Sequence, residues 1–236
     1  MNRLLTPSEY FRFIEEFDHY FPAGMTFHSL LSQFNMKIEE IVIFHRFVIN
    51  THNKNKISIN SQHDKFKILS NQEIEKLSED EQYFYERAFC SHMENCRAKE
   101  SLNNNVFFIA NDSVVINTWA IVEQYMTRGL ACLISKMENK NISDVVPPYK
   151  WNSIQQKFLS YGIDFNSLPS YDDINECRVL NNKIKHLNIV DSALEKFPSF
   201  SGKLNMQLFG MNYPLQKYIL AAHHFIGMLL EECSQK

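Results

Sequence analysis

Three polar side chains within the stretch 176–188 have types and spacing that could do chemistry. Arg178, Asn182 and His186 follow one another at intervals of four, so on a helix they form a single row. A guanidinium, an amide and an imidazole in one line, with no carboxylate among them, could hold a phosphate. The opposite side of the same helix carries an apolar stripe typical of a core-facing surface: Cys177, Leu180, Ile184 and Leu187.

The stretch 180–186 resembles the signature of the HEPN superfamily, in which an Arg is followed after about four to six residues by a His on the same helix. The match lies in the apolar positions, the central Asn182 and His186. Asn181 stands where the family usually has its Arg, and the nearest guanidinium is that of Arg178, one turn earlier. Because an Arg side chain is long, we interpret Arg178 as the substitute. The resemblance covers this one helix directly.

The resemblance implies an all-helical bundle that acts as a metal-independent endoribonuclease of the toxin–antitoxin or phage-defence type. His186 would be the base or acid that serves attack of a ribose 2′-hydroxyl on the adjacent phosphate. Arg178 and Asn182 would hold the phosphate and neutralise its developing charge, and Asn181 would add a further donor.

The same resemblance carries expectations about partners. Lys183 and Lys185 would attract the RNA backbone without reading its sequence. Since one helix offers only half a site, a homodimer that pairs two such helices is expected, and an antitoxin or another protein is a further expected partner. Neither a metal nor a cofactor is expected.

Two other interpretations stay open. The chain could be a catalytically inactive HEPN-like module that binds a nucleotide, RNA or a protein partner. It could also be an unrelated helical scaffold in which Asn182 and His186 bond a neighbouring element. In that case Arg178 would pair with a nearby acid, for which the candidates are Asp172, Asp173 and Glu176.

Composition points to an all-α fold. The chain has 236 residues, of which 44% are hydrophobic, so it can bury a substantial core. With 6 Gly and 7 Pro in the whole chain, helices are favoured over a turn-rich β architecture. We therefore expect a single domain over 1–236, a HEPN-like bundle of about five to seven helices.

Charge and cysteine usage narrow the class of protein further. A net charge of −3 removes the global electrostatic argument for a protein that coats nucleic acid, so any RNA contact must be local. Five scattered cysteines are not typical of a disulfide framework. No uncharged apolar stretch in the sequence suggests a membrane span and the first residues do not resemble a signal peptide, so we expect a cytoplasmic protein without membrane contact.

Capping and periodicity place the expected elements along the chain. The motif helix should begin at 170–173 and end near His186 or Leu187. Polar connections are expected at 103–105 and 139–148. The short apolar run 106–110 is expected to be a strand or an extended lead-in to the most regular helix. The other expected helices are 6–20, 27–52, 72–99, 112–137, 151–161 and 213–233.

The segment 53–70 reads differently, because apolar and polar residues alternate with the period of a strand around Ile57 and Ile59 and again near Phe66. We predict an inserted β-hairpin here. It is also the most basic segment, so it is either a solvated excursion or an arm that steers phosphate; its lysines are Lys54, Lys56, Lys65 and Lys67.

Two other clusters are weaker candidates for chemistry. Cys90, His92 and Cys96 lack the two-residue spacing and second pair of a zinc site, so core or half-exposed thiols are expected. His223 and His224 are adjacent on a helix and point about 100° apart, so they cannot chelate one ion together and one of them should face inward. The sequence contains no glycine-rich phosphate loop or nucleophile elbow.

Overall fold

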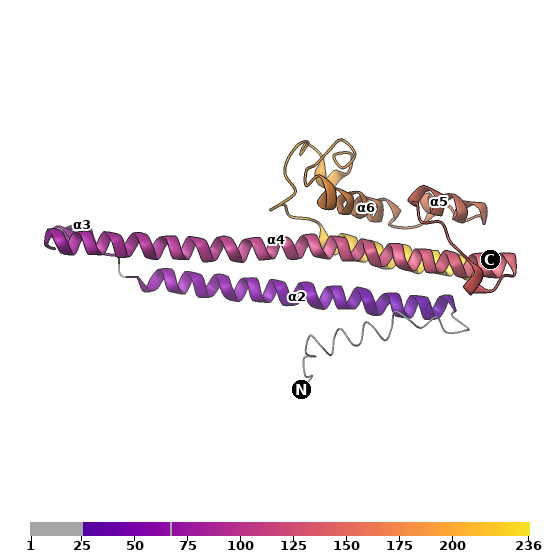
Figure 1. Ribbon diagram of the computed structural model, residues 1–236, viewed down its shortest axis with the longest axis horizontal. Coiled ribbons are helices and arrows are strands. Elements are labelled where there is room, and N and C mark those ends of the chain that lie inside the picture. Colours follow the sequence, from indigo (N-terminus) through magenta and orange to yellow (C-terminus); the bar gives the residue numbers. More distant parts are fainter. Residues whose placement is uncertain (1–25, 67) are drawn as a thin grey trace, which may run out of the picture.

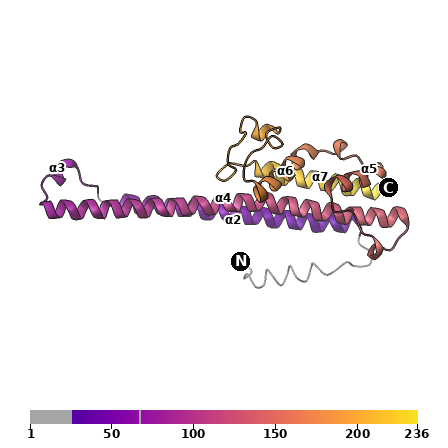
Figure 2. The same ribbon diagram turned by 45° about the horizontal axis from the view of Figure 1, so that its top comes forward.

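The computed structural model describes residues 26–66 and 68–236, so the helix predicted at 6–20 lies outside the described part. Two long helices dominate it, α2 (Phe27–Lys65) and α4 (Glu79–Glu138), which run antiparallel side by side. The short helix α3 (Asn71–Ile74) lies in the connection between them, at the end of the molecule far from the remaining helices (Figures 1 and 2).

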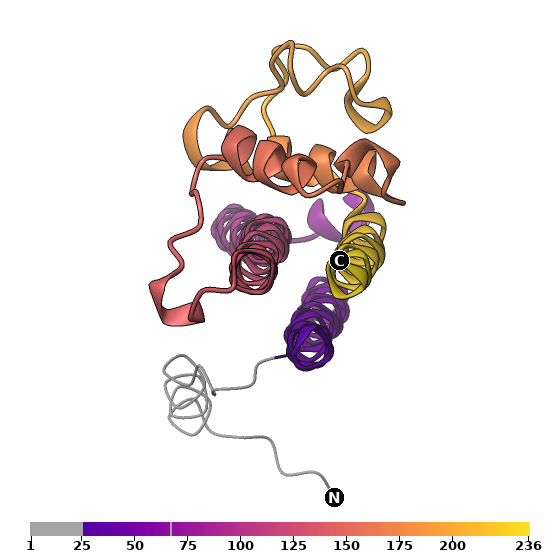
Figure 3. The same cartoon turned by 90° about the vertical axis from the view of Figure 1, so that its right-hand side faces the viewer.

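The remaining helices lie at the other end of the helical hairpin that α2 and α4 form. Helix α7 (Leu215–Gln235) lies along both α2 and α4, and α5 (Trp151–Ser160) and α6 (Tyr171–His186) form a layer over α4 and α7 (Figure 3). Single 3₁₀ turns lie in the connections, at Ile142–Asp144, Phe165–Ser167 and Pro198–Phe200. The described part therefore has six α-helices and no strand, and the predicted all-α class is confirmed.

Side-chain caps define where the long helices begin. The Ser78 hydroxyl accepts from the backbone N–H of Glu81, whose carboxylate in turn accepts from the backbone N–H of Ser78 at 2.8 Å. Thr26 and Ser29 make the equivalent reciprocal pair at the start of α2. At the other end of α4, Asn139 adopts a left-handed conformation with φ of 50°, which ends the helix.

The predicted hairpin at 53–70 is wrong, because residues 53–65 continue α2. The alternation had an ordinary helical cause: Ile59 is half-buried on the side that faces α4, and Ile57 points to solvent with 70% exposure. With no Gly or Pro in the segment, nothing interrupts the helix. Lys54, Lys56 and Lys65 therefore lie on a helix and not on a hairpin loop, and Lys67 lies outside the described residues.

The predicted connection at 103–105 is also wrong, because these asparagines lie inside α4. Asn103 and Asn104 bond α2: Asn103 donates to the backbone carbonyl of His52 at 3.1 Å and accepts from Asn55 at 3.1 Å. Asn104 pairs with the His52 ring at 3.1 Å. Because these polar side chains are used between helices, the run of asparagines does not break α4.

The packed core lies in only one half of the hairpin. In α4 the first buried residue is Cys96, and the continuous series of buried positions starts at Ala110. In α2 no described residue after Ile41 is buried. We call residues 42–66 and 68–109, which include α3 at the tip, the arm, and residues 26–41 and 110–236 the bundle.

Helix α4 is the one helix in the described residues that is long and apolar enough to cross a membrane. That property was not expected from the sequence, and it concerns length and composition alone. Of the apolar 18-residue stretch, 39% is buried inside the protein, and a core helix of a soluble protein has the same character.

Glu138, the last residue of α4, gathers an ion-pair cluster that ties α4 to α5. Its carboxylate binds Lys140 at 2.8 Å and Lys157 at 3.0 Å, and accepts from the Tyr161 hydroxyl at 2.7 Å. These three donors, Lys140 first, lower the pKa of Glu138 from its ordinary 4.5 to about 2. The cluster therefore favours the ionised carboxylate in the folded protein.

The cluster predicts a particular acid sensitivity. A folded-state pKa below the unfolded value gives stability that is complete above the unfolded pKa and is lost as the pH falls toward about 2. Glu138→Gln should therefore flatten the fall in the urea midpoint between about pH 4.5 and 2. Glu39→Gln, at an exposed position of α2, is the control. Parallel pH profiles for the wild type and Glu138→Gln would contradict the assignment.

Candidate functional site

The motif helix is α6, and its bounds agree with the prediction. Its apolar stripe holds it on the bundle: Cys177 and Leu180 are fully buried, and the Cys177 thiol lies 3.9 Å from the backbone carbonyl of Val115 in α4. Ile184 is partly buried against the same core. Leu187, expected in this stripe, is instead 54% exposed, because it lies just past the end of the helix.

A buried carboxylate fixes α6 to α7. Glu176 is 1% exposed, and its two oxygens accept from the Lys217 ammonium and the Tyr218 hydroxyl, each at 2.7 Å. Lys217 also pairs with Asp173 at 3.2 Å and donates to the Ser199 hydroxyl at 3.3 Å. Burial, and next the Glu176 carboxylate, raise the pKa of Tyr218, so its hydroxyl stays protonated as a donor. This network sets how α6 lies in the bundle.

The sequence held a signal for this network that the motif analysis missed. Glu176 lies four residues before Leu180, so it falls within the apolar stripe and not on the solvent face. A carboxylate in that position must be buried, and a buried charge needs a partner. Its partners, Lys217 and Tyr218, are more than forty residues away in the chain. Local spacing could not identify them.

Arg178, the first member of the row, is packed on its own chain. Its Nε donates to the Asn175 side chain at 3.0 Å, and its guanidinium lies over the Trp151 ring, 5.0 Å from the centroid. Burial lowers the pKa of Arg178, and the nearby Tyr171 and Glu123 oppose that effect. In the described residues no acid forms an ion pair with Arg178, in contrast to the pairing that the scaffold interpretation expected.

The two asparagines of the motif have different environments. Asn181, for which the resemblance to the HEPN signature expected an Arg, is 2% exposed, so its side chain is directed into the protein. Its amide nitrogen donates to the Asn182 side-chain oxygen at 3.2 Å, and its own buried side-chain oxygen has no hydrogen-bond partner in the described part of the chain. Asn182 is exposed, and its amide nitrogen remains available to a ligand.

The C-terminal end of α6 is the accessible part of the motif. Lys185 and His186 are both exposed, and no acid among the described residues pairs with either. Lys183 is engaged, because its ammonium lies 2.6 Å from the Asp191 carboxylate and lowers the pKa of Asp191. We call Asn182, Lys185 and His186 the α6 end.

The side chains of Arg178 and His186, at the two ends of the row, lie far apart along α6. Eight residues separate Arg178 from His186, which corresponds to about 12 Å along the axis. Long side chains on a helix lean toward its N-terminus, and the Arg178 guanidinium lies over Trp151, the first residue of α5. One chain therefore does not bring this guanidinium and the imidazole onto one phosphate.

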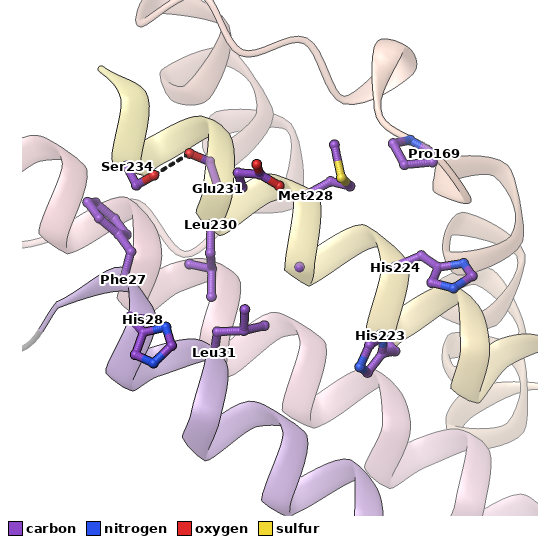
Figure 4. Close-up of a pocket in the computed structure, with 11 residues that line it drawn as sticks. Phe27, His28, Leu31, Pro169, His223, His224, Met228, Leu230, Glu231 and Ser234 are labelled. Atoms are coloured by element: carbon purple, nitrogen blue, oxygen red, sulfur yellow. Dashed lines mark hydrogen bonds between the residues drawn. The ribbon is translucent and has the colours of Figure 1, made fainter.

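A cavity of about 610 Å³ lies elsewhere, between the start of α2 and α7. Figure 4 shows His28 of α2 on one side of it and His223 and His224 of α7 on the other, with Leu31 and Leu230 between them. Both His223 and His224 are exposed, so the prediction that one of them faces inward is wrong.

Neither this cavity nor the cysteine cluster provides a metal site. No group of three metal-ligating side chains comes together in the described residues. Cys96 is buried, and its thiol lies 3.7 Å from the His92 ring, while Cys90 is exposed. All five cysteines are free thiols, in agreement with the absence of a disulfide framework.

Comparison with known proteins adds no assignment to this geometry. No protein-family model matches the chain, and neither a curated protein nor a solved structure matches it. The functional argument therefore depends on the residues themselves.

Proposed function

We propose that the protein is a HEPN-like, cytoplasmic helical module that binds RNA through backbone phosphate at the α6 end. The observation that carries this proposal is the exposure of Asn182, Lys185 and His186 together, with no acid paired to Lys185 or His186 in the described part. An ammonium, an imidazole and an amide are suitable donors to phosphoryl oxygens. The biological setting proposed is a toxin–antitoxin or phage-defence system, with an antitoxin or another protein as a further partner.

Binding without catalysis is favoured over cleavage by the position of Arg178. A nuclease needs donors around the charge that develops on the phosphate, and this guanidinium is stacked on Trp151, away from His186. The inactive HEPN-like module is therefore our first candidate.

A metal-independent endoribonuclease is the second candidate, favoured by the exposure of His186, which pairs with no acid among residues 26–66 and 68–236. In that case a second copy of the chain would supply the donor that its own Arg178 does not, so cleavage would require a homodimer. His186 would take or give the proton at the ribose 2′-hydroxyl.

RNA binding by the α6 end can be measured by fluorescence anisotropy with a labelled single-stranded RNA. We expect the double variant Lys185→Ala/His186→Ala to weaken binding by roughly tenfold at low salt, because two phosphate contacts are lost. Lys196→Ala removes an exposed lysine outside α6 and should change affinity little. Equal affinity of the double variant and the wild type would remove the proposal.

Catalysis is tested separately by incubating RNA with the protein in the presence of a chelator. Chelator-resistant cutting that disappears in His186→Ala would establish the second candidate. The same low background with both proteins would leave the inactive module as the function.

A further inference from the structure

One face of the arm presents large apolar side chains to water. Phe44 and Phe47 of α2 are 45% and 63% exposed, and three residues of α4 are more than half exposed. We call these five residues the arm face: Phe44, Phe47, Leu102, Val106 and Ile109. Contiguous exposed apolar surface of this kind is typical of an interaction site.

The five side chains form one surface across both helices. Phe47, Leu102 and Val106 line the same groove, which has a volume of about 440 Å³. The pairing of His52 with Asn104 fixes the register of the two helices. Phe44 lies one turn from Phe47, and Ile109 lies one turn from Val106, so both extend the groove toward the bundle.

The arm lacks the packing that such long helices need. Two helices bury only the stripes by which they face one another, and in the arm that stripe includes a single buried residue, Cys96. Helices gain most of their stability from burial of an apolar face against other elements. The arm face is a second apolar surface on the same hairpin, and no element of the described chain covers it.

We propose that a second copy of this chain covers the arm face, with the two arms packed antiparallel around a twofold axis near Phe47. The product is a four-helix bundle built from two helical hairpins. At the exposures observed, each side chain of the arm face offers on the order of 100 Å². Two copies therefore bury about 1,000 Å² before the polar rim is added, which is where specific interfaces begin.

The charges around the arm face fit self-association in this orientation. The five residues themselves are uncharged, so two identical faces meet without like-charge repulsion. Glu40, which also pairs with Lys37 at 3.1 Å, lies seven residues before Phe47. Lys99, which also donates to the Gln62 side chain at 2.7 Å, lies seven residues before Val106, and both separations are about 10 Å along the helix. Because α2 and α4 are antiparallel, these charges lie toward opposite ends of the face. The twofold arrangement then places Glu40 of each copy at the level of Lys99 of its partner.

Phe47→Glu and Ile57→Glu form a matched pair of variants for this proposal. Both replace an exposed apolar residue of α2, with 63% and 70% exposure, and Ile57 lies outside the groove. The full-length proteins are compared by sedimentation velocity over a range of concentrations. We expect a wild-type dimer, a roughly 30-fold or larger increase of the dimer Kd in Phe47→Glu, and little change in Ile57→Glu. Circular dichroism checks that each variant keeps its helices.

A monomeric wild type would overturn the proposal, since the arm face would then not be covered by a second copy of the chain. Equal dissociation by both variants would overturn it as well.

The antiparallel orientation has its own test: Lys99→Glu should weaken the dimer, and adding Glu40→Lys on the same chain should restore it. Failure of this restoration rules out the proposed arrangement. None of these measurements involves RNA, so the dimer can be confirmed or rejected independently of the proposed function.

Discussion

Glu176→Ala is expected to lower the free energy of unfolding by about 3 kcal/mol at neutral pH, because it removes one partner from a buried ion pair. The variant leaves the Tyr218 hydroxyl without its acceptor beneath α6, and it leaves the Lys217 ammonium with Asp173 and the Ser199 hydroxyl as its remaining partners. Lys217 is partly exposed and can turn to water, whereas Tyr218 is buried and cannot. Urea denaturation followed by circular dichroism measures the loss.

Two further variants distinguish the loss of this hydrogen-bond network from the general effect of a substitution on stability. Glu176→Gln keeps an acceptor for Tyr218 and removes the charge that faces Lys217, so its cost should lie between those of the wild type and Glu176→Ala. Glu39→Ala makes the same change at an exposed position of α2 and should stay within about 0.5 kcal/mol of the wild type. If Glu176→Ala costs no more than Glu39→Ala, the network does not hold α6.

Phe34→Ala is expected to cost about 3 to 5 kcal/mol, the range for removal of a buried aromatic ring. Phe34 is fully buried between α2 and α4, where its ring makes an edge contact with Tyr125 at 5.5 Å between centroids. Because Phe34 lies in the bundle, the cost should appear in the global unfolding transition and not as local loosening of the arm.

Phe84→Ala is the control for this variant. Phe84 is 67% exposed near the tip of α4, so the same change in side chain should alter the unfolding free energy by less than about 1 kcal/mol. Similar losses in the two variants, measured by thermal denaturation, would show that the packed core is not confined to the bundle half.

Much of the fold could be predicted where the signals are local. The bounds of α5, α6 and α7 agree with the expected helices within about two residues, because the helical period of apolar residues is clear there, although no side-chain cap marks the start of any of the three. The regular helix expected over 112–137 is present as the C-terminal part of α4, and its buried positions have the predicted spacing.

The arm could not be predicted in the same way. Asn103 and Asn104 resemble a connection in the sequence, and only their bonds to α2 residues about fifty positions away explain why they lie in a helix. The alternation around Ile57 and Ile59 was too short to separate a strand from a sparsely buried helix. In both places the decisive contacts are tertiary, and a local pattern does not contain them.

For the candidate site, too, the sequence predicted the local features and missed those that depend on tertiary contacts. The spacing correctly placed Asn182 and His186 on the solvent side of α6. It could not indicate that Arg178 stacks on Trp151, which belongs to another helix. Nor did it show that Asn181 lies inside the protein, since a polar residue beside the apolar stripe can lie on either side of the boundary.

The continuity of α4 has a mechanical consequence. Its 60 residues form a rod of about 90 Å that begins at the tip of the arm and ends beside α5. Because no connection interrupts this rod, the two ends cannot move independently: a displacement imposed at the tip tilts the surface on which α6 rests. A partner that binds the distal end of α4 would thereby change the orientation of His186.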